Sequence, residues 1–224
     1  MGMTADDHLE QTQRLYERAV FGGDASALAD AERHLSAVEA NLALARGRVA
    51  HARLLAAMSR TLPDPDDVVD ELALFERASQ LYRDLGGVRG EAEAQFWIGT
   101  FHQMVRHDDA VAVPALERAR ALATEADDPL TLSCALRHLG IARHRAGELD
   151  EARSYLEEPT QLRRQLGFGA GVAANLVGLA YLAAGSERRD EVPAILDEAD
   201  ALARQGVAAG ITHQIDEARQ QLIR

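Results

Sequence analysis

The sequence contains no lysine, and this absence excludes several kinds of chemistry. All 24 basic residues are arginine. A chain without lysine cannot form a Schiff base with a carbonyl substrate, and it cannot supply the lysine of a phosphate-binding loop. The glycine-rich segment 167–171 therefore predicts a turn between helices rather than a phosphate cradle.

Cysteine, aromatic residues and proline are also scarce. Cys134 is the only cysteine, so an internal disulfide and a cysteine-based zinc cluster are excluded, and its apolar neighbours predict a small core residue. Aromatic residues make up 4% of the chain, which leaves leucine, alanine and valine to build the core. With six prolines and few runs rich in valine, isoleucine and threonine, the composition predicts an all-α protein.

The charge is strongly negative, with a net value of −12. This argues against nucleic acid and against an anionic membrane surface as partners. The apolar run 169–185 carries Asn175 near its middle and is too short to span a bilayer. The segment 1–7 is short, polar and acidic, unlike a signal peptide. We therefore expect a cytoplasmic protein, and the bias toward alanine and arginine favours a bacterial origin.

An internal repeat of about forty residues is the clearest feature that is present. Ile98-Gly99 recurs as Leu139-Gly140 and as Val177-Gly178. A period of this length is typical of stacked two-helix units, in which each unit buries its apolar face against its neighbours. The repeat predicts one domain over 1–224, with units at 6–46, 47–87, 88–128, 129–169 and 170–210 and a capping helix at 211–224.

Local signals mark the ends of the predicted helices. Asp128-Pro129 combines an N-cap acceptor with proline at the first helical position, and Asp64-Pro65 repeats this pair. Gly22-Gly23-Asp24 predicts a turn. From 26 to 58 only Gly47 interrupts the helical pattern, so the sequence leaves open whether one helix or two occupy this segment.

Pro159 interrupts the pattern of its neighbours. Adjacent repeats carry Ala119 and Ala199 at this position. A proline inside a helix removes one hydrogen bond and clashes with the preceding turn, at about 3 kcal/mol. We expect a kink or a broken helix, either as curvature at a surface or as a distortion that shapes a pocket.

The unit around Leu136-x-x-Leu139-Gly140, followed by Ala152 and Leu156, resembles a tetratricopeptide repeat. The resemblance implies a right-handed α-solenoid of antiparallel helix pairs, with a concave groove that binds peptides. It also implies that the repeated glycines at 99, 140 and 178 lie where the two helices of a unit pack closely. The units exceed the 34 residues of the family, as in the longer variant of bacterial sensor and regulator proteins.

In such a solenoid the first helix of each unit lines the concave face. Steps of three and four residues from the repeated glycine give the side chains on that face. Arg137 and Asn175 could together hold a carboxylate; alternatively, Arg137 is a solvated residue paired with Glu93. Trp97 either stacks on a ligand or fills the space between units. The predicted groove consists of Glu93, Phe96, Thr100, Gln103, Arg137, Ile141, His144, Asn175 and Leu179.

No catalytic residues, metal site or cofactor are predicted. His102 and His107, like His138 and His144, do not form the i, i+4 pair that would place two imidazoles on one helical face. No nucleophile–base–acid set follows from the spacing. If the groove served as a reaction chamber, Arg137, His144 and Tyr181 would be the first candidates.

The sequence thus predicts a non-catalytic module that binds a protein or peptide partner in its groove. A small-molecule-sensing regulatory module is the alternative, and an enzyme of a bacterial biosynthetic pathway is a third possibility. A homodimer is also possible: in the terminal helix Ile211, Ile215, Ala218 and Leu222 form one stripe, which would drive dimerisation if it stayed open.

Overall fold

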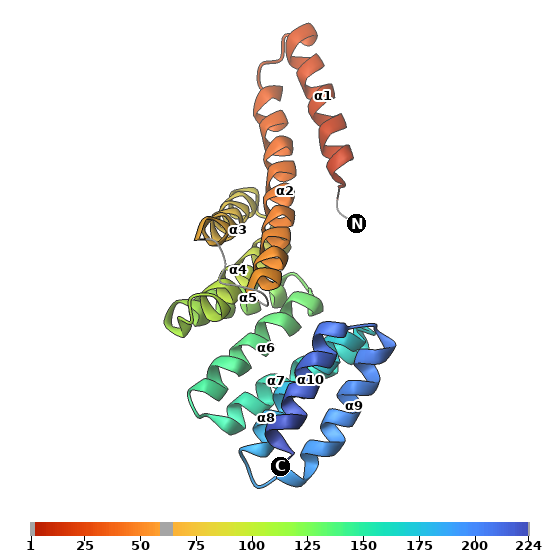
Figure 1. Ribbon diagram of the computed structural model, residues 1–224. Helices are drawn as coiled ribbons and strands as arrows, with labels where there is room; N and C mark the ends of the chain where they lie inside the picture. Colours follow the sequence, from red (N-terminus) through yellow and green to blue (C-terminus); the bar gives the residue numbers. More distant parts are fainter. Residues whose placement is uncertain (1–2, 59–64, 224) are drawn as a thin grey trace.

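The computed structural model describes residues 3–58 and 65–223, and that part of the chain is helical, with no strand. The all-α prediction is confirmed. Figure 1 shows the described helices in chain order. They are α1 (Ala5–Gly22), α2 (Ala27–Met58), α3 (Pro65–Leu85), α4 (Val88–Met104), α5 (Asp109–Glu125), α6 (Pro129–Arg145), α7 (Leu149–Gln165), α8 (Gly169–Ala184), the short 3₁₀ turn η1 (Arg189–Glu191), α9 (Val192–Gln205) and α10 (Ala209–Leu222).

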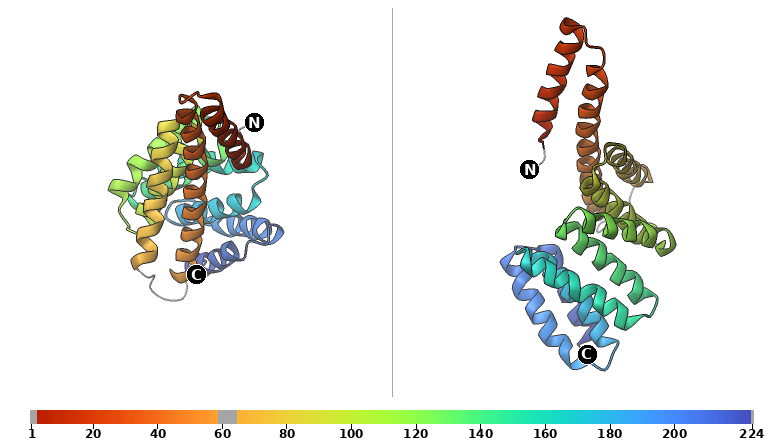
Figure 2. Two further views of the ribbon diagram at one scale, coloured as in Figure 1. Left: turned by 90° about the horizontal axis from the view of Figure 1, so that it is seen from above. Right: turned by 180° about the vertical axis from the view of Figure 1, so that it is seen from behind.

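Each helix packs against the next one along the chain. In addition, α6 contacts α4 and α8, and α10 contacts both α8 and α9. The views of Figure 2 show that the α1–α2 hairpin projects away from the group formed by the later helices. The longest helix therefore has one end in the body of the protein and the other in a two-helix arm.

The turn that leads from one unit to the next has the same backbone shape each time. One residue in each turn has a positive φ of 48–68°, at positions 86, 127, 167 and 207. The N–H that follows donates to the carbonyl five residues earlier, at 2.7–2.9 Å in all four turns. The forty-residue repeat of the sequence is therefore a repeated helix–turn–helix geometry.

The predicted caps hold where the chain is described. Asp128 accepts a hydrogen bond from the N–H of Thr131 at 3.3 Å, and Pro129 is the first residue of α6. Asp108 caps α5 in the same way. Gly23 ends α1 with a left-handed φ of 73°. Asp64, the cap predicted before Pro65, lies outside the described residues.

A single helix, α2, runs from Ala27 to Met58, which decides between the two alternatives that the sequence left open. The unit boundary drawn between 46 and 47 therefore falls inside this helix. Gly47 does not interrupt it; instead the glycine lets α3 approach closely. A Cβ atom at this position would lie 2.5 Å from Cε1 of the buried Phe75 ring.

Gly47→Ala should destabilise the protein by about 1–3 kcal/mol, although alanine is intrinsically the better helix former. The reason is the close contact with Phe75, whose ring is fully buried. Urea unfolding measures the change. Gly210→Ala in α10 is the matched control, because no atom lies within 4 Å of the position that the added methyl group would take. Equal stabilisation by both changes would contradict the packing role of Gly47.

Close packing also explains the repeated glycines, although not in the same way at all three positions. A Cβ at Gly99 would lie 2.6 Å from Leu116 of α5, and one at Gly140 would lie 3.1 Å from Tyr155 of α7. These two glycines sit between the helices of one unit, as the repeat pattern predicts. Gly178 instead faces Leu156, which belongs to the preceding unit.

Pro159 does not break its helix, so the expectation of a broken helix is wrong. α7 continues from Leu149 to Gln165 with Pro159 buried inside it. The next residue, Thr160, donates its hydroxyl to the carbonyl of Leu156 at 2.6 Å, and packing of α7 against α6 and α8 holds the segment. Pro114 likewise lies inside the continuous helix α5, and the repeat pattern did not predict a proline at this position.

The last helix covers the end of the core. Ile215 and Ala218 of α10 are fully buried, and Ile211 and Leu222 pack against the same cluster. The stripe expected in this segment is therefore occupied by α8 and α9, and it does not form the open apolar surface that a dimer at this end would require.

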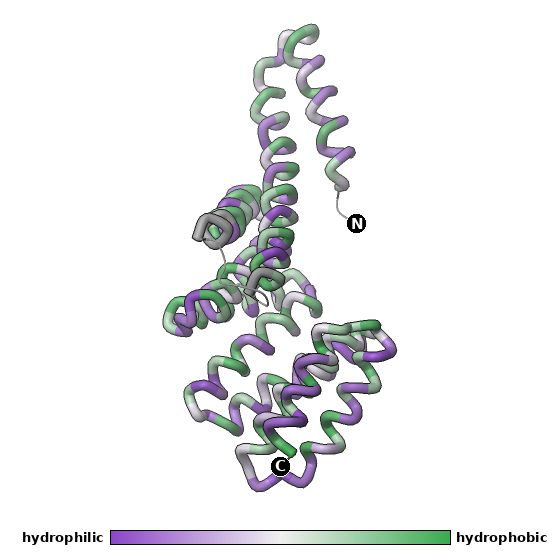
Figure 3. Tube along the Cα trace, in the orientation of Figure 1, coloured by the Kyte–Doolittle hydropathy of each residue, from purple (hydrophilic) through white to green (hydrophobic). Residues whose placement is uncertain are grey.

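Polar and apolar residues alternate along the helices, as the hydropathy colours of Figure 3 show. Within 3–58 and 65–223, no helix combines the length and the apolar character that crossing a bilayer requires.

Candidate functional site

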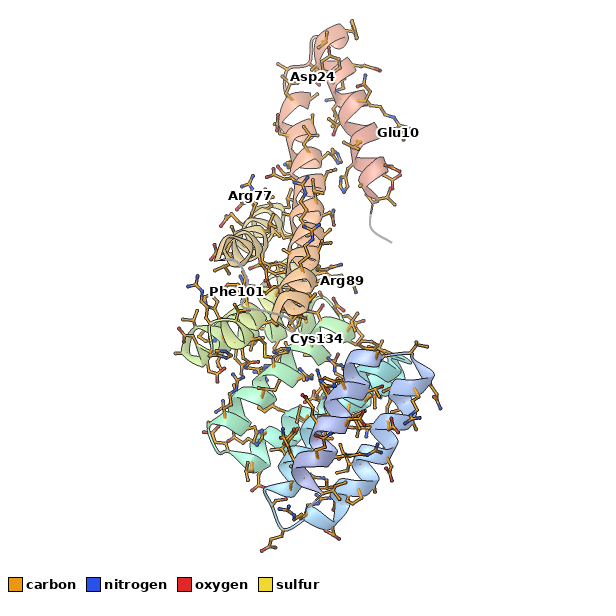
Figure 4. All side chains as sticks on the ribbon, in the orientation of Figure 1. Glu10, Asp24, Arg77, Arg89, Phe101 and Cys134 are labelled. Carbon is orange, nitrogen blue, oxygen red and sulfur yellow. The ribbon has the colours of Figure 1, made fainter. Side chains whose placement is uncertain are left out.

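A cavity of about 350 Å³ lies where α6 faces the helices that follow it. It collects side chains from α4, α6, α7, α8 and α10, so it exists only because these helices pack together. Figure 4 labels Cys134, one of its lining residues. The cavity is lined by Phe96, Cys134, Arg137, His138, Arg163, Phe168, Ala170, Gly171, Ala174, Ile211 and Gln214.

Arg163 lies at the back of this cavity and is only 4% exposed. Its guanidinium donates to the carbonyl of Gly171 at 2.9 Å, to Oδ1 of Asn175 at 2.7 Å and to Oγ of Ser133 at 3.2 Å. Its Nη2 also lies 3.4 Å from the sulfur of Cys134. All these partners are neutral, so the hydrogen bonds fix the group in place without balancing its charge.

Arg137 is the second cation of the cavity. It is partly buried, and within the described ranges it has no hydrogen bond and no ion pair. Burial lowers its pKa to about 10, and the positive charge of Arg163 contributes in the same direction, with a smaller opposite effect from Cys134. Arg137 therefore remains charged at neutral pH. Two guanidiniums line one cavity, and neither has a described carboxylate partner.

His138 lies beside the two arginines and is neutral. Burial holds its pKa well below 6.5, and the nearby charges of Arg137 and Arg163 act in the same direction. The side-chain amide of Gln103 determines the tautomer of the His138 ring. The amide nitrogen Nε2 of Gln103 donates to the His138 carbonyl at 3.0 Å. The amide oxygen Oε1 of Gln103 therefore accepts from Nδ1 of the His138 ring at 2.7 Å. Nδ1 therefore carries the proton, and Nε2 remains an acceptor.

This lowered pKa predicts a pH dependence of stability. The unfolded chain binds a proton at His138 near pH 6.5, whereas the folded protein does not, so stability is full above that pH and falls as the pH drops below it. The slope for one such group approaches about 1.4 kcal/mol per pH unit. His138→Gln should reduce the loss of unfolding free energy between pH 7 and 5. His144→Gln, at an exposed position of the same helix, should leave that loss unchanged.

Two aromatic rings complete the wall of the cavity. Phe96 packs edge-on against the His138 ring with centroids 5.5 Å apart, and the Phe168 ring lies 5.7 Å from the guanidinium carbon of Arg163. Trp97 is not part of this wall. It stacks on Phe75 at 5.5 Å and contacts Phe96 at 5.0 Å, so it fills the space between α4 and the helices before it.

The residues predicted to line a groove are placed in two different environments. Phe96 and Arg137 meet at the cavity. Thr100, Gln103 and Asn175 are buried at 4% exposure or less, so none of them offers a surface to a ligand. Asn175 instead positions Arg163 through its Oδ1, while its Nδ2 has no hydrogen-bond partner among the described residues.

The other predicted residues lie away from the cavity. Glu93 forms an ion pair with Arg48 of α2 and accepts a hydrogen bond from Trp97. It does not pair with Arg137, which was the alternative interpretation of the sequence. Leu179 belongs to the C-terminal core, Ile141 is partly buried and His144 is exposed. Tyr181 donates its hydroxyl to Gln221 at 3.0 Å, so it is not brought together with Arg137 or His144.

Sequence reasoning missed Arg163, although a signal was present. The repeats place Ala123 and Ala203 at the corresponding position, and both are fully buried. When one unit carries arginine where the other units carry a buried alanine, that unit must contain polar partners for the arginine inside the core. The sequence pattern suggested His138 only as a metal ligand or a general base. Within the described ranges, no three His, Cys, Asp or Glu side chains form a group that could hold a metal ion.

The arrangement suits binding of an anion attached to an apolar body. Two cations without a described acidic partner attract the anion, and two phenyl rings contact the apolar part. Comparison with known proteins gives no independent indication of function: no protein-family model and no curated protein matches this chain.

Proposed function

We propose that this protein is a non-catalytic binding module that recognises a partner through a carboxylate held in the Arg137–Arg163 cavity. The observation that carries the proposal is Arg137, a partly buried guanidinium whose pKa burial lowers and which has no described acidic partner. Partial removal of a charge from water without a counter-charge is unfavourable, so a ligand anion that pairs with it recovers part of that free energy. Arginine can also hold a carboxylate through two parallel hydrogen bonds.

The two arginines have different tasks in this proposal. Arg163 is held by four neutral partners and supplies a fixed positive field, whereas Arg137, which has no hydrogen bond within the described ranges, can donate to the ligand. Phe96 and Phe168 contact the apolar part of the ligand. The partner is a protein whose exposed C-terminus or acidic side chain enters the cavity, in keeping with the helical repeat. No step of bond making is involved.

A small organic acid is the second candidate, and the cavity volume favours it. About 350 Å³ lies within the range of roughly 300–1,000 Å³ that is usual for small-molecule sites. The protein would then act as a sensor whose occupancy is reported to another component. Both candidates share the same carboxylate chemistry.

A melting-temperature screen separates the two sources of the carboxylate. One arm uses short peptides with an apolar last residue and either a free or an amidated C-terminus, and the other uses aromatic and aliphatic carboxylic acids. A ligand that binds the folded state raises the melting temperature. We expect free-acid peptides to raise it and their amides not to. A response to small acids alone would favour the sensor, and no response in either arm would contradict carboxylate recognition.

Arg137→Gln should abolish the response in the effective arm, because the glutamine carries no charge. Arg143→Gln is the matched control: Arg143 lies on the same helix but already pairs with Glu148 at 2.8 Å. Loss of the response in both variants would point to a general effect of charge rather than to the cavity.

We also infer that the units 88–128, 129–169 and 170–210 are tetratricopeptide-like and wind into a right-handed α-solenoid. The recurring turn at 86, 127, 167 and 207 and the close approach of helices at Gly99 and Gly140 support this. An experimental structure measures the handedness directly, and a left-handed arrangement of the three units would contradict it.

A further inference from the structure

The long helix α2 carries an apolar stripe that the other described helices leave largely exposed. Leu28, Leu35, Leu42 and Val49 recur every seven residues and are 39–51% exposed. Val38, Ala45 and Ala52 lie three residues after the last three of these positions, and the two alanines are exposed. This is the a/d spacing of a coiled coil, which calls for a second helix along the stripe. It runs for about 40 Å at 1.5 Å per residue.

The helices packed on α2 cover only the upper end of this stripe. α1 covers Ala27 and also Ala31, which lies three residues after Leu28, whereas α3 packs on another face, against Ala43, Leu44 and Gly47. Figure 1 and Figure 2 show the first turns of α2 flanked by α1, while α3 joins α2 further along, where Arg77 pairs with Glu39. In Figure 3 hydrophobic segments recur along this same length. The stripe is therefore open to another molecule.

The charges beside the stripe indicate which molecule. Glu32 and Glu39 precede Arg46 and Arg53 at seven-residue intervals, all on one edge of the stripe and all exposed. In the described chain Glu32, Arg46 and Arg53 have no ion pair, and Glu39 pairs with Arg77 of α3 at 2.8 Å. The edge is thus acidic in its first half and basic in its second.

Such an edge is complementary to itself in one orientation only. When two copies of α2 run antiparallel about a midpoint near Leu42, Glu32 of one copy lies across from Arg53 of the other, and Glu39 lies across from Arg46. The same pairing sets Leu35 against Ala52 and Leu42 against Ala45, so each large side chain meets a small one. A parallel pair would instead gather the arginines of both copies, including Arg48, at one end.

We propose that the α1–α2 arm is a homodimerisation element in which the stripe of α2 packs antiparallel against the same stripe of a second copy. A two-fold interface of this kind uses one patch on both subunits. It leaves the Arg137–Arg163 cavity, which lies among α4 and the later helices, outside the contact. The inference is independent of the proposed ligand.

Analytical ultracentrifugation of the full chain tests the dimer. We expect the wild type to sediment as a dimer and Leu35→Glu/Leu42→Glu to sediment as a monomer with unchanged helix content. Leu130→Glu is the matched control, because Leu130 of α6 is also 48% exposed but lies off the stripe; it should remain dimeric. A monomeric wild type at every concentration, or dimers unaffected by the double change, would overturn the proposal.

Charge reversal tests the self-complementary edge. Arg46→Glu/Arg53→Glu makes the edge wholly acidic, and Glu32→Arg/Glu39→Arg makes it wholly basic. Each variant alone should be monomeric, and an equimolar mixture should form heterodimers. Dimers of either variant alone as stable as the wild type would contradict the pairing.

Cross-linking then tests the orientation. In a background with Cys134→Ser, a mixture of Leu35→Cys and Ala52→Cys chains should form an intermolecular disulfide, because the antiparallel register brings these positions together. Neither variant alone should do so. Efficient cross-linking of Leu35→Cys with itself would show a parallel pair and overturn the antiparallel arrangement.

Discussion

Replacing Phe75 with alanine should lower the free energy of unfolding by about 3–5 kcal/mol, the usual range for a buried phenylalanine. The ring is 0% exposed and stacks on Trp97 with an interplanar angle of 6°. It also fills the space that Gly47 leaves open on α2. Its removal would create a cavity at the point where α2, α3 and α4 meet, so the arm and the repeat units would lose their common contact.

Urea unfolding followed by circular dichroism measures this change. Phe21→Ala is the matched control, because the same side chain at the end of α1 is 82% exposed. It should change the unfolding free energy by less than about 0.5 kcal/mol. Similar effects at both positions would contradict the role assigned to Phe75.

Replacing His51 with leucine should destabilise the protein by about 3–5 kcal/mol, for a different reason. Glu71 is fully buried, and its Oε1 lies 2.6 Å from Nδ1 of His51. The other oxygen, Oε2, has no described partner. Leucine fills a similar space but leaves the carboxyl group without any described hydrogen bond in the core. The loss therefore measures an isolated buried polar group rather than an empty volume.

Two further variants establish the cause. His213→Leu removes the partner of Glu217 in an exposed pair at 3.3 Å, and it should change stability by less than about 1 kcal/mol. The double change His51→Leu/Glu71→Leu should recover most of the stability lost in the single variant, because no unpaired carboxyl group remains. A double variant as unstable as His51→Leu would show that shape rather than polarity governs this site.

The helix boundaries from 88 onward could be predicted because they depend on local chemistry. Asp128 caps α6 through its own side chain, Pro129 suits the first helical position, and Gly147 has a left-handed φ of 80° in the turn that follows. Such signals act within a few residues and can be read from the sequence. Across 26–58 the sequence is ambiguous, because a glycine can lie either inside a helix or at its end, and the sequence alone does not show which applies to Gly47.

The position of the cavity could not be predicted because it depends on long-range packing. The inner stripe was placed by stepping from the repeated glycines, which assumes an open concave face. α10 lies against α8, and Thr100, Gln103 and Asn175 are buried. Arg163, which comes from the second helix of its unit, enters the cavity because Ser133, Gly171 and Asn175 hold it there. No spacing rule relates these residues.

The most direct test of the account is a calorimetric titration with the strongest carboxylate ligand of the melting-temperature screen. Wild type, Arg137→Gln and Arg143→Gln are compared. We expect Arg137→Gln to weaken binding by about 2–3 kcal/mol, roughly 30- to 150-fold. Arg143→Gln should bind like the wild type. Equal affinity of wild type and Arg137→Gln would contradict the claim that Arg137 receives the anion.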